Sequence, residues 1–246
     1  MDVASVSTLL ADPGIPPAEL ARRAGVSRNT EWALRKDQSR ANLATLRELA
    51  LACGSDLTVA AVPASDPLAS AAARSILGDL ETDSSAALAA WETRLKRWTG
   101  HATPLDIALE AARVSAPQHR TAARLFFGRN DVDRLASAGI ASGSTWVLSG
   151  AAALEALDER PSEPELPVIV WSADVEQFAK LLLDTHRTVR VQTIATVIVA
   201  PLHPSMLAGM TNIEGIPLVS PIQAVIDCFG VGGELADRAF EIAKDW

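Results

Sequence analysis

Apolar residues recur every three or four positions along residues 3–60, which is the spacing of α-helices that each bury one face. The residues of these faces are Val3, Val6, Leu9 and Leu10, then Leu20, Ala21 and Ala24, and finally Leu43, Leu46, Leu49 and Ala50. Gly25 suits the left-handed end of the second helix, and Ser27 suits the N-cap of a further helix. Two helices joined by a short turn with a glycine have the spacing of a helix-turn-helix. The pattern therefore predicts an all-α unit over residues 1–62.

The middle of the chain, residues 63–143, is predicted to be a linker followed by helices. Residues 60–72 are small and include prolines, which is typical of a connection between domains. A helix is expected over residues 84–99, with a packing face made by Leu88, Trp91, Leu95 and Trp98. Further short helices are predicted over residues 104–114, 117–127 and 130–138.

From Thr145 onwards, short runs of β-branched residues replace the helical spacing and predict strands. The run LPVIVW is continuously apolar, so we expect a strand that is buried on both faces. Strands and helices follow one another in the predicted order β-α-β-α-β-β-α-α. Residues 144–246 are therefore expected to form an α/β domain with a small mixed sheet, and the whole chain an α+β protein.

Charge is distributed unevenly along the chain. The net charge of −8 excludes a basic coat of the kind that binds nucleic acid over the whole surface. Residues 20–47, however, contain seven basic and two acidic side chains, a local excess of +5. Such an excess in one small helical unit is typical of a phosphate-binding surface, and a solvated helix face is the alternative.

Several classes of protein are not expected from the composition. Cys53 and Cys228 lie far apart and outside any zinc-ligand spacing, so neither a disulfide scaffold nor a structural zinc site is predicted. The longest apolar runs are about ten residues, too short to span a bilayer. Asp2 and the lack of a basic segment near it predict no secretory signal. We expect a cytoplasmic protein without membrane contact.

The segments ELARRAGVSRNT and ANLATLRELALACG resemble the Cro/repressor-type (XRE) helix-turn-helix domain over roughly residues 3–60. The resemblance implies that the helix after Ser27 enters the major groove of DNA. Arginine and asparagine there suit base readout, because they pair bidentately with guanine and adenine. The residues expected to bind operator DNA are Arg22, Ser27, Arg28, Asn29, Thr30, Arg35, Lys36 and Arg40. The alternative is a helix-turn-helix that serves only for dimerisation or packing.

Glu31 departs from this family, which usually has a buried valine or isoleucine at its position. An unpaired carboxylate would be costly there. Two outcomes are open: the helix is rotated so that Trp32 and Leu34 pack, or Glu31 reaches solvent or Arg35 one turn later.

The segments VLSGAAALEAL, PVIVW and LVSPIQAVIDCFG are similar to the C-terminal domain of AbiEi-type antitoxins, over about residues 144–246. Usual members carry a winged helix at the N-terminus, where this chain has its XRE-like unit. The resemblance implies a DNA-binding antitoxin that represses its own type IV toxin–antitoxin operon, with a nucleotidyltransferase-like toxin as partner. A ligand-responsive transcriptional regulator and a divergent nucleotidyltransferase are the alternatives.

The segment STWVLSGAAAL also resembles the opening of the nucleotidyltransferase fold. That chemistry requires two carboxylates on the next strand to hold metal ions, and residues 168–171 contain none. We therefore predict that the chain is not an enzyme and needs no metal or cofactor. Ser149 is interpreted as a capping residue at a tight turn, with anion binding as the alternative. Asp227 is expected to have a structural role in the core, where it satisfies a backbone group or an arginine.

A homodimer is predicted, because one helix-turn-helix contacts too few base pairs to discriminate among genomic sites. The candidate dimer surfaces are the helix with Trp91 and Trp98 and the apolar positions Ile222, Val225 and Ile226. A second basic cluster is expected to be solvated, with a second DNA-contacting face as the alternative; it consists of Arg113, Arg120, Arg124 and Arg129.

Overall fold

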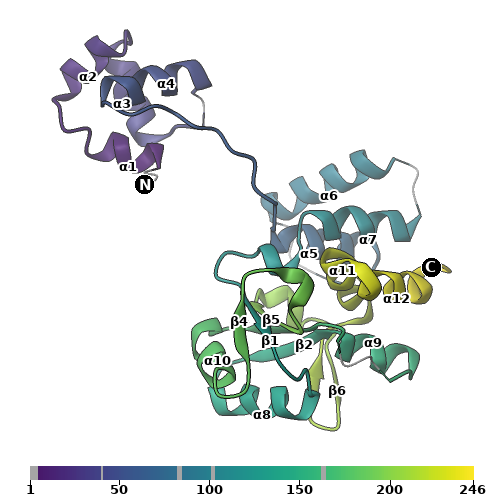
Figure 1. Cartoon of the computed structure of the whole chain (residues 1–246). Coiled ribbons are helices and arrows are strands. Elements are labelled where there is room, and N and C mark those ends of the chain that lie inside the picture. The colour runs from purple at the N-terminus through teal and green to yellow at the C-terminus, as the bar shows by residue number, and fades with distance from the viewer. Residues whose placement is uncertain (1–4, 40, 82–84, 101–102, 162–164) are drawn as a thin grey trace. The chain divides into compact units, whose positions relative to one another are not determined.

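The structure is a computed structural model that describes residues 5–39, 41–81, 85–100, 103–161 and 165–246 (Figure 1). The chain divides into two compact units, residues 1–62 and residues 63–246. The structure places residues 63–143 and 144–246 in the same unit. Each unit has its own hydrophobic core.

The first unit consists of short helices around a small core, as the apolar spacing predicts. The helices are α1 (Val6–Ala11), α2 (Pro17–Arg23), α3 (Arg28–Lys36) and α4 (Leu43–Ala52). The side chains of Ser5, Ser27 and Asn42 cap α1, α3 and α4 by accepting hydrogen bonds from backbone N–H groups. Buried leucines and one alanine form the core: Leu10, Leu20, Ala24, Leu34 and Leu49.

A group of three helices opens the second unit: α5 (Pro67–Ile76), α6 (Ala86–Thr99) and α7 (Pro104–Arg113). The boundary between the two units falls within the predicted connection at residues 60–72, but that connection does not extend through residue 72, because α5 begins at Pro67 and its alanines are buried. Asp66 caps this helix and the proline occupies its first turn, where a missing N–H costs nothing. Small side chains there allow close helix packing rather than flexibility.

Among the residues that the structure describes, the sheet of the second unit has seven strands in the order β4-β1-β5-β3-β2-β7-β6. The strands are β1 (Arg124–Phe127), β2 (Trp146–Gly150), β3 (Val168–Ser172), β4 (Arg187–Val189), β5 (Val197–Pro201), β6 (Thr211–Ile213) and β7 (Ile216–Leu218). Central β3 runs antiparallel to β2 and parallel to β5, so the sheet is mixed as predicted. Every residue of β3 is buried, which confirms the expectation from its continuous apolar run.

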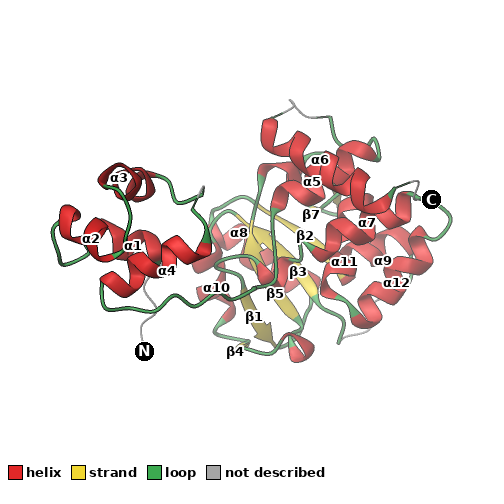
Figure 2. Cartoon of the chain, turned by 90° about the horizontal axis from the view of Figure 1, so that it is seen from above, coloured by secondary structure: helices red, strands yellow, loops and turns green. Residues whose placement is uncertain are grey.

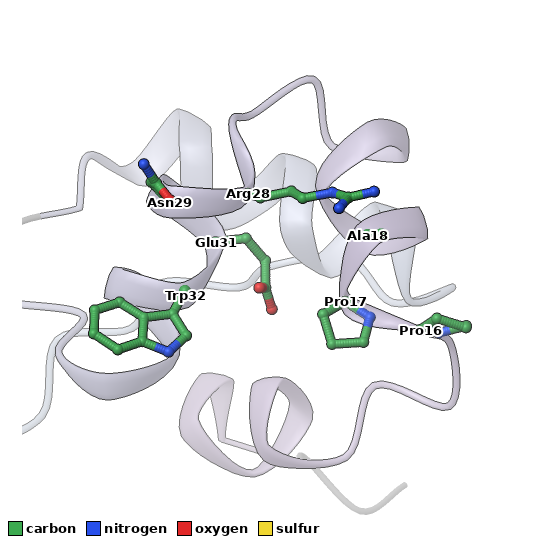
Figure 3. Close-up of a pocket in the computed structure, with 7 residues that line it drawn as sticks. All are labelled: Pro16, Pro17, Ala18, Arg28, Asn29, Glu31 and Trp32. Atoms are coloured by element: carbon green, nitrogen blue, oxygen red, sulfur yellow. The ribbon is translucent and has the colours of Figure 1, made fainter.

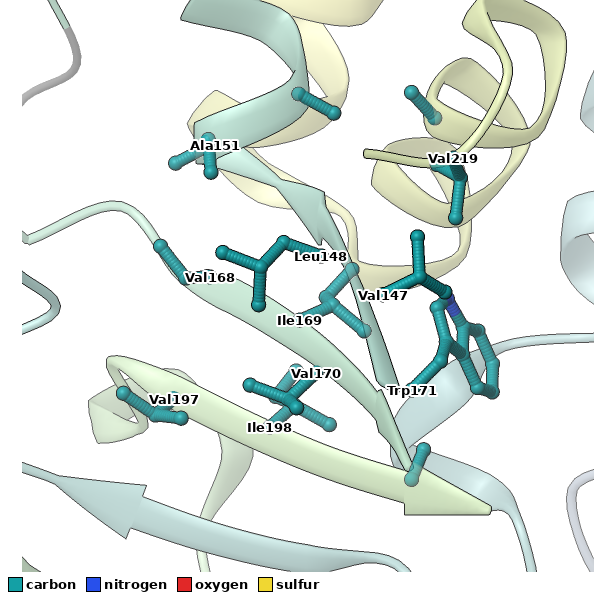
Figure 4. Packing of buried hydrophobic residues seen from close by; sticks show 14 of the residues in the cluster. Val147, Leu148, Ala151, Val168, Ile169, Val170, Trp171, Val197, Ile198 and Val219 are labelled. Carbon is teal, nitrogen blue, oxygen red and sulfur yellow. The ribbon is translucent and has the colours of Figure 1, made fainter. Parts of the chain in front are cut away.

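Helices cover both faces of this sheet (Figures 1 and 2). One face carries α8 (Val132–Ser142) and α10 (Val175–Leu182), and the other carries α9 (Ala151–Asp158) and α11 (Pro221–Val231), with α12 (Gly233–Ala243) packed on α9 and α11. Short 3₁₀ turns lie in the connections: Pro117–His119, Gln192–Ile194 and Pro204–Leu207. Figure 4 shows the branched side chains of β2, β3 and β5 packed together in the core.

Two predictions about the sheet are wrong. The expected helix over residues 117–127 is a 3₁₀ turn followed by β1, which pairs antiparallel with both β4 and β5. The expected small sheet is larger, because β1 joins it and because residues 211–218 form the paired strands β6 and β7. Both errors concern short strands: β1 and β7 pair with strands that are distant in the sequence, whereas β6 pairs with the adjacent strand β7 in a short hairpin.

Candidate nucleic-acid interface

The turn between α2 and α3 is built from local hydrogen bonds that fix where α3 begins. Gly25 has a φ of +66°, a conformation that side chains with a Cβ rarely adopt. The Val26 N–H donates to the Ala21 carbonyl at 3.0 Å and so closes the end of α2. The Ser27 hydroxyl then accepts from the Thr30 N–H at 3.0 Å. The predicted helix-turn-helix geometry is therefore present.

Helix α3 exposes one continuous face along its length. Arg28, Trp32 and Lys36 follow one another at intervals of one turn, and Asn29 lies beside them. All four side chains are exposed, whereas Leu34 on the opposite side is buried in the core. The face thus combines hydrogen-bond donors, two cations and an indole ring.

Glu31 lies next to this face but is only 4% exposed. Its carboxylate accepts hydrogen bonds from the Arg35 guanidinium, at 2.9 Å from Nε. Trp32 is 59% exposed, so the alternative in which the helix rotates to pack the indole is wrong. Of the outcomes left open by the sequence, the pairing of Glu31 with Arg35 is the one observed.

Most cations in the positive segment are already paired within the first unit. Arg22 and Arg23 both donate to Glu19, and their hydrogen bonds lower the pKa of Glu19 to about 2. Arg47 pairs with Asp56 in the same way. Both carboxylates lie outside residues 20–47, so counting charge in that window alone overestimated the free positive charge.

A pocket of about 640 Å³ opens between the start of α2 and the exposed face of α3 (Figure 3). Trp32 lies on one side of it, and Pro16 and Pro17 lie on the other, with Glu31 between them. Arg28 and Asn29 also line the pocket. The pocket therefore has both apolar and polar lining, and the charge of its one carboxylate, Glu31, is compensated by Arg35.

The expected DNA-binding residues fall into three groups. Ser27 and Thr30 are engaged with each other in the helix cap, with 2.8 Å between their hydroxyl oxygens. Arg22 and Arg35 are ion-paired, and Arg40 lies outside the described residues. Within the described chain, Arg28 and Asn29 make no side-chain hydrogen bond or ion pair, and Lys36 lies 3.9 Å from the centre of the Trp32 ring. The last three are the ones free to meet a ligand.

The second basic cluster does not form one exposed surface, because Arg120 is only 7% exposed. Its guanidinium lies 5.5 Å from the centre of the Trp171 ring and donates to two backbone carbonyls. Burial lowers its pKa to about 10. Arg113 and Arg124 are each paired with a glutamate. For Arg120, both the expectation of a solvated side chain and the alternative of a second DNA-contacting face are therefore wrong.

Asp227 is the centre of a buried polar cluster beneath the sheet. Its carboxylate accepts hydrogen bonds from the Ser149 hydroxyl at 2.7 Å, from the Trp171 indole at 2.9 Å and from the Gln223 amide at 2.8 Å. Burial raises the pKa of Asp227 to about 6. The expectation of a structural role for Asp227 in the core is confirmed, but the expected partner is wrong: the hydrogen bonds come from three side chains and not from a backbone group or an arginine.

Ser149 does not have the role expected for it. Its side chain is completely buried and donates to Asp227, and it does not cap α9, which begins after Gly150. The interpretation as a capping serine is therefore wrong, because the hydroxyl donates its hydrogen bond to Asp227 in the buried cluster.

Of the two candidate dimer surfaces, the one on α11 is largely interior and the one on α6 is partly exposed. Val225 and Ile226 are fully buried, because α11 packs between the sheet and α7. Trp91 packs on the helical core, and its indole donates to Asp66 at 2.9 Å, as expected for a packing residue. Trp98 is 43% exposed and meets Trp91 edge-on.

No family model, curated protein or solved structure matches this chain. Among the residues that the structure describes, no three histidine, cysteine, aspartate or glutamate side chains are grouped as metal ligands would be. Within the same residues, each helix is too short or too polar to cross a bilayer.

Proposed function

We propose that this chain binds double-stranded DNA through the exposed face of α3 and regulates transcription. The observation that carries the proposal is the state of Arg28 and Asn29, whose side chains are exposed and make no hydrogen bond or ion pair within the described chain. Both lie in the first turn of α3, the helix that follows the turn of the helix-turn-helix. In such units, the N-terminal part of the second helix contacts base edges in the major groove.

The chemistry of this face suits base edges better than it suits a phosphate backbone. Arg28 can donate bidentately to guanine, and Asn29 can both donate to and accept from adenine. Few unpaired cations are left for phosphate, because Arg22, Arg23 and Arg47 are held by carboxylates. This distribution favours selective binding over a strong non-specific component.

Binding of the full chain to DNA from its own promoter tests the proposal. Arg28→Ala and Asn29→Ala are each expected to weaken specific binding by about 1–3 kcal/mol, as the loss of one bidentate contact does. Arg113→Ala is the matched control, because this exposed arginine lies in the second unit and is paired with Glu110. Fluorescence anisotropy at fixed salt would give the dissociation constants. Equal binding by residues 63–246 alone would contradict the proposal.

The role as antitoxin and autorepressor stays a prediction from the AbiEi-like segments. It implies that a neighbouring gene encodes a nucleotidyltransferase-like toxin. Expression of that gene with and without this chain, scored by growth, tests the prediction. Growth arrest that this chain does not relieve would favour a regulator without a toxin.

A further inference from the structure

Trp32 is placed where a large apolar ring serves no purpose in folding the unit. The core is completed by leucines from all four helices, and Trp32 remains 59% exposed outside it. It lies one turn beyond Arg28 on the same exposed row of α3. Lys36 lies over the ring at 3.9 Å and supports one orientation of it.

The surroundings of the ring keep negative charge away from the exposed face. The carboxylate in the adjoining pocket, Glu31, is buried and paired with Arg35. The charged side chains that remain on the face, Arg28 and Lys36, are both cations. A surface of this kind complements a polyanion that also presents a small apolar group.

The major groove of DNA presents one such group, the C5-methyl of thymine. At a rise of about 1.5 Å per residue, Trp32 lies roughly 6 Å along α3 from Arg28. That separation corresponds to about two base-pair steps. A thymine near the base that Arg28 contacts would therefore lie within reach of the ring.

We propose that Trp32 reads thymine in the operator half-site by packing its indole against the C5-methyl group. The inference rests on the proposed function and adds a sequence requirement to it. Arg28 and Asn29 supply the hydrogen-bonding part of the readout, and Trp32 supplies the apolar part.

The experiment compares thymine with deoxyuridine, which lacks only the methyl group. The probe is the best-bound duplex selected with the full chain from a library randomised over its central segment. Each thymine is replaced singly by deoxyuridine, and affinities are measured for the wild type and for Trp32→Ala, Trp32→Phe and Trp246→Ala. Trp246→Ala is the matched control, since this exposed tryptophan lies in the second unit.

For the wild type, deoxyuridine at the contacted position should weaken binding about fourfold, the effect of removing one buried methyl group. Trp32→Ala should bind the parent duplex more weakly and show no further loss with deoxyuridine. Trp32→Phe, which retains an apolar ring, should remain sensitive to it, and Trp246→Ala should behave as the wild type. Circular dichroism of each variant should show unchanged helix content, because Trp32 is outside the core.

Deoxyuridine effects that are equal in the wild type and Trp32→Ala would overturn this inference alone. Unchanged DNA affinity of Trp32→Ala would also overturn the inference and would favour a protein as the partner of the indole. If no duplex is bound by the full chain, the proposed function and this inference both fail.

Discussion

Asp227 brings a titratable carboxyl group into a fully buried position, where three hydrogen bonds offset only part of its loss of hydration. Its pKa in the folded chain is about 6, above the ordinary value of 3.8. Between these values the folded chain binds a proton more readily than the unfolded chain does. The contribution of Asp227 to stability therefore falls as the pH rises through this window, and it is constant above the window.

We expect Asp227→Asn to remove this pH dependence. The free energy of unfolding of the wild type minus that of the variant should fall by on the order of 3 kcal/mol between about pH 4 and pH 7. Urea unfolding at a series of pH values measures this difference. Taking the difference removes the contribution of the other carboxylates, which both proteins contain. A difference that stays flat across the window would contradict the assignment.

The Glu31–Arg35 pair makes a second prediction at the scale of single residues. Arg35→Ala leaves a buried carboxylate without its cation and should destabilise α3 by about 1–3 kcal/mol, between the values for exposed and for fully buried pairs, because Arg35 is partly exposed. In a Glu31→Val background, Arg35→Ala should change the stability of α3 only slightly. Hydrogen exchange of the α3 amides in the full chain measures both. Equal costs in the two backgrounds would show that the pair is not coupled.

At the scale of elements, the N-terminus of α11 is tied to the helical group by one serine. The Ser220 hydroxyl accepts from the Gln223 N–H and donates to Asp79 at 2.6 Å. The same carboxylate oxygen accepts from Arg74, a completely buried arginine whose guanidinium also donates to two backbone carbonyls. The Ser220 hydroxyl therefore both caps α11 and donates to the carboxylate of the buried Arg74–Asp79 ion pair.

We expect Ser220→Ala to lower the free energy of unfolding by about 2–3 kcal/mol, because it removes a cap and a hydrogen bond to a buried charge. Ser85→Ala is the control, since Ser85 caps α6 at an exposed position with no ion pair attached. It should cost about 1 kcal/mol. Urea unfolding of the full chain measures the two, and equal costs would argue against a connecting role for Ser220.

At the scale of the whole molecule, a single α3 offers few base-reading side chains, namely Arg28, Asn29 and, by the inference above, Trp32. Each mismatch with so short a site costs only about 1–3 kcal/mol. We therefore expect two chains to bind one duplex with half-sites about one helical turn apart. Light scattering of the complex gives the stoichiometry. One chain on a complete palindromic site would contradict this prediction.

Features that depend on neighbouring residues could be predicted from the sequence alone. The helices of the first unit, the left-handed Gly25 and the N-cap at Ser27 follow from backbone preferences and from groups three or four residues apart. The burial of β3 follows from its unbroken apolar run. Such features are encoded within one element, so no knowledge of distant residues is required.

Only the tertiary structure decided which apolar residues are exposed and which charges pair beyond a single helix. The Arg22–Glu19 pair lies within α2 at a spacing of three residues and was open to prediction, whereas Arg47 pairs with Asp56 beyond the end of α4. The sequence treated Val225 as a surface for another chain, whereas folding buries it. Strand β1 and the Asp227 cluster likewise join segments that are far apart along the chain. Burial and pairing across such distances depend on the packing of the whole unit, which cannot be predicted from the local periodicity of the sequence.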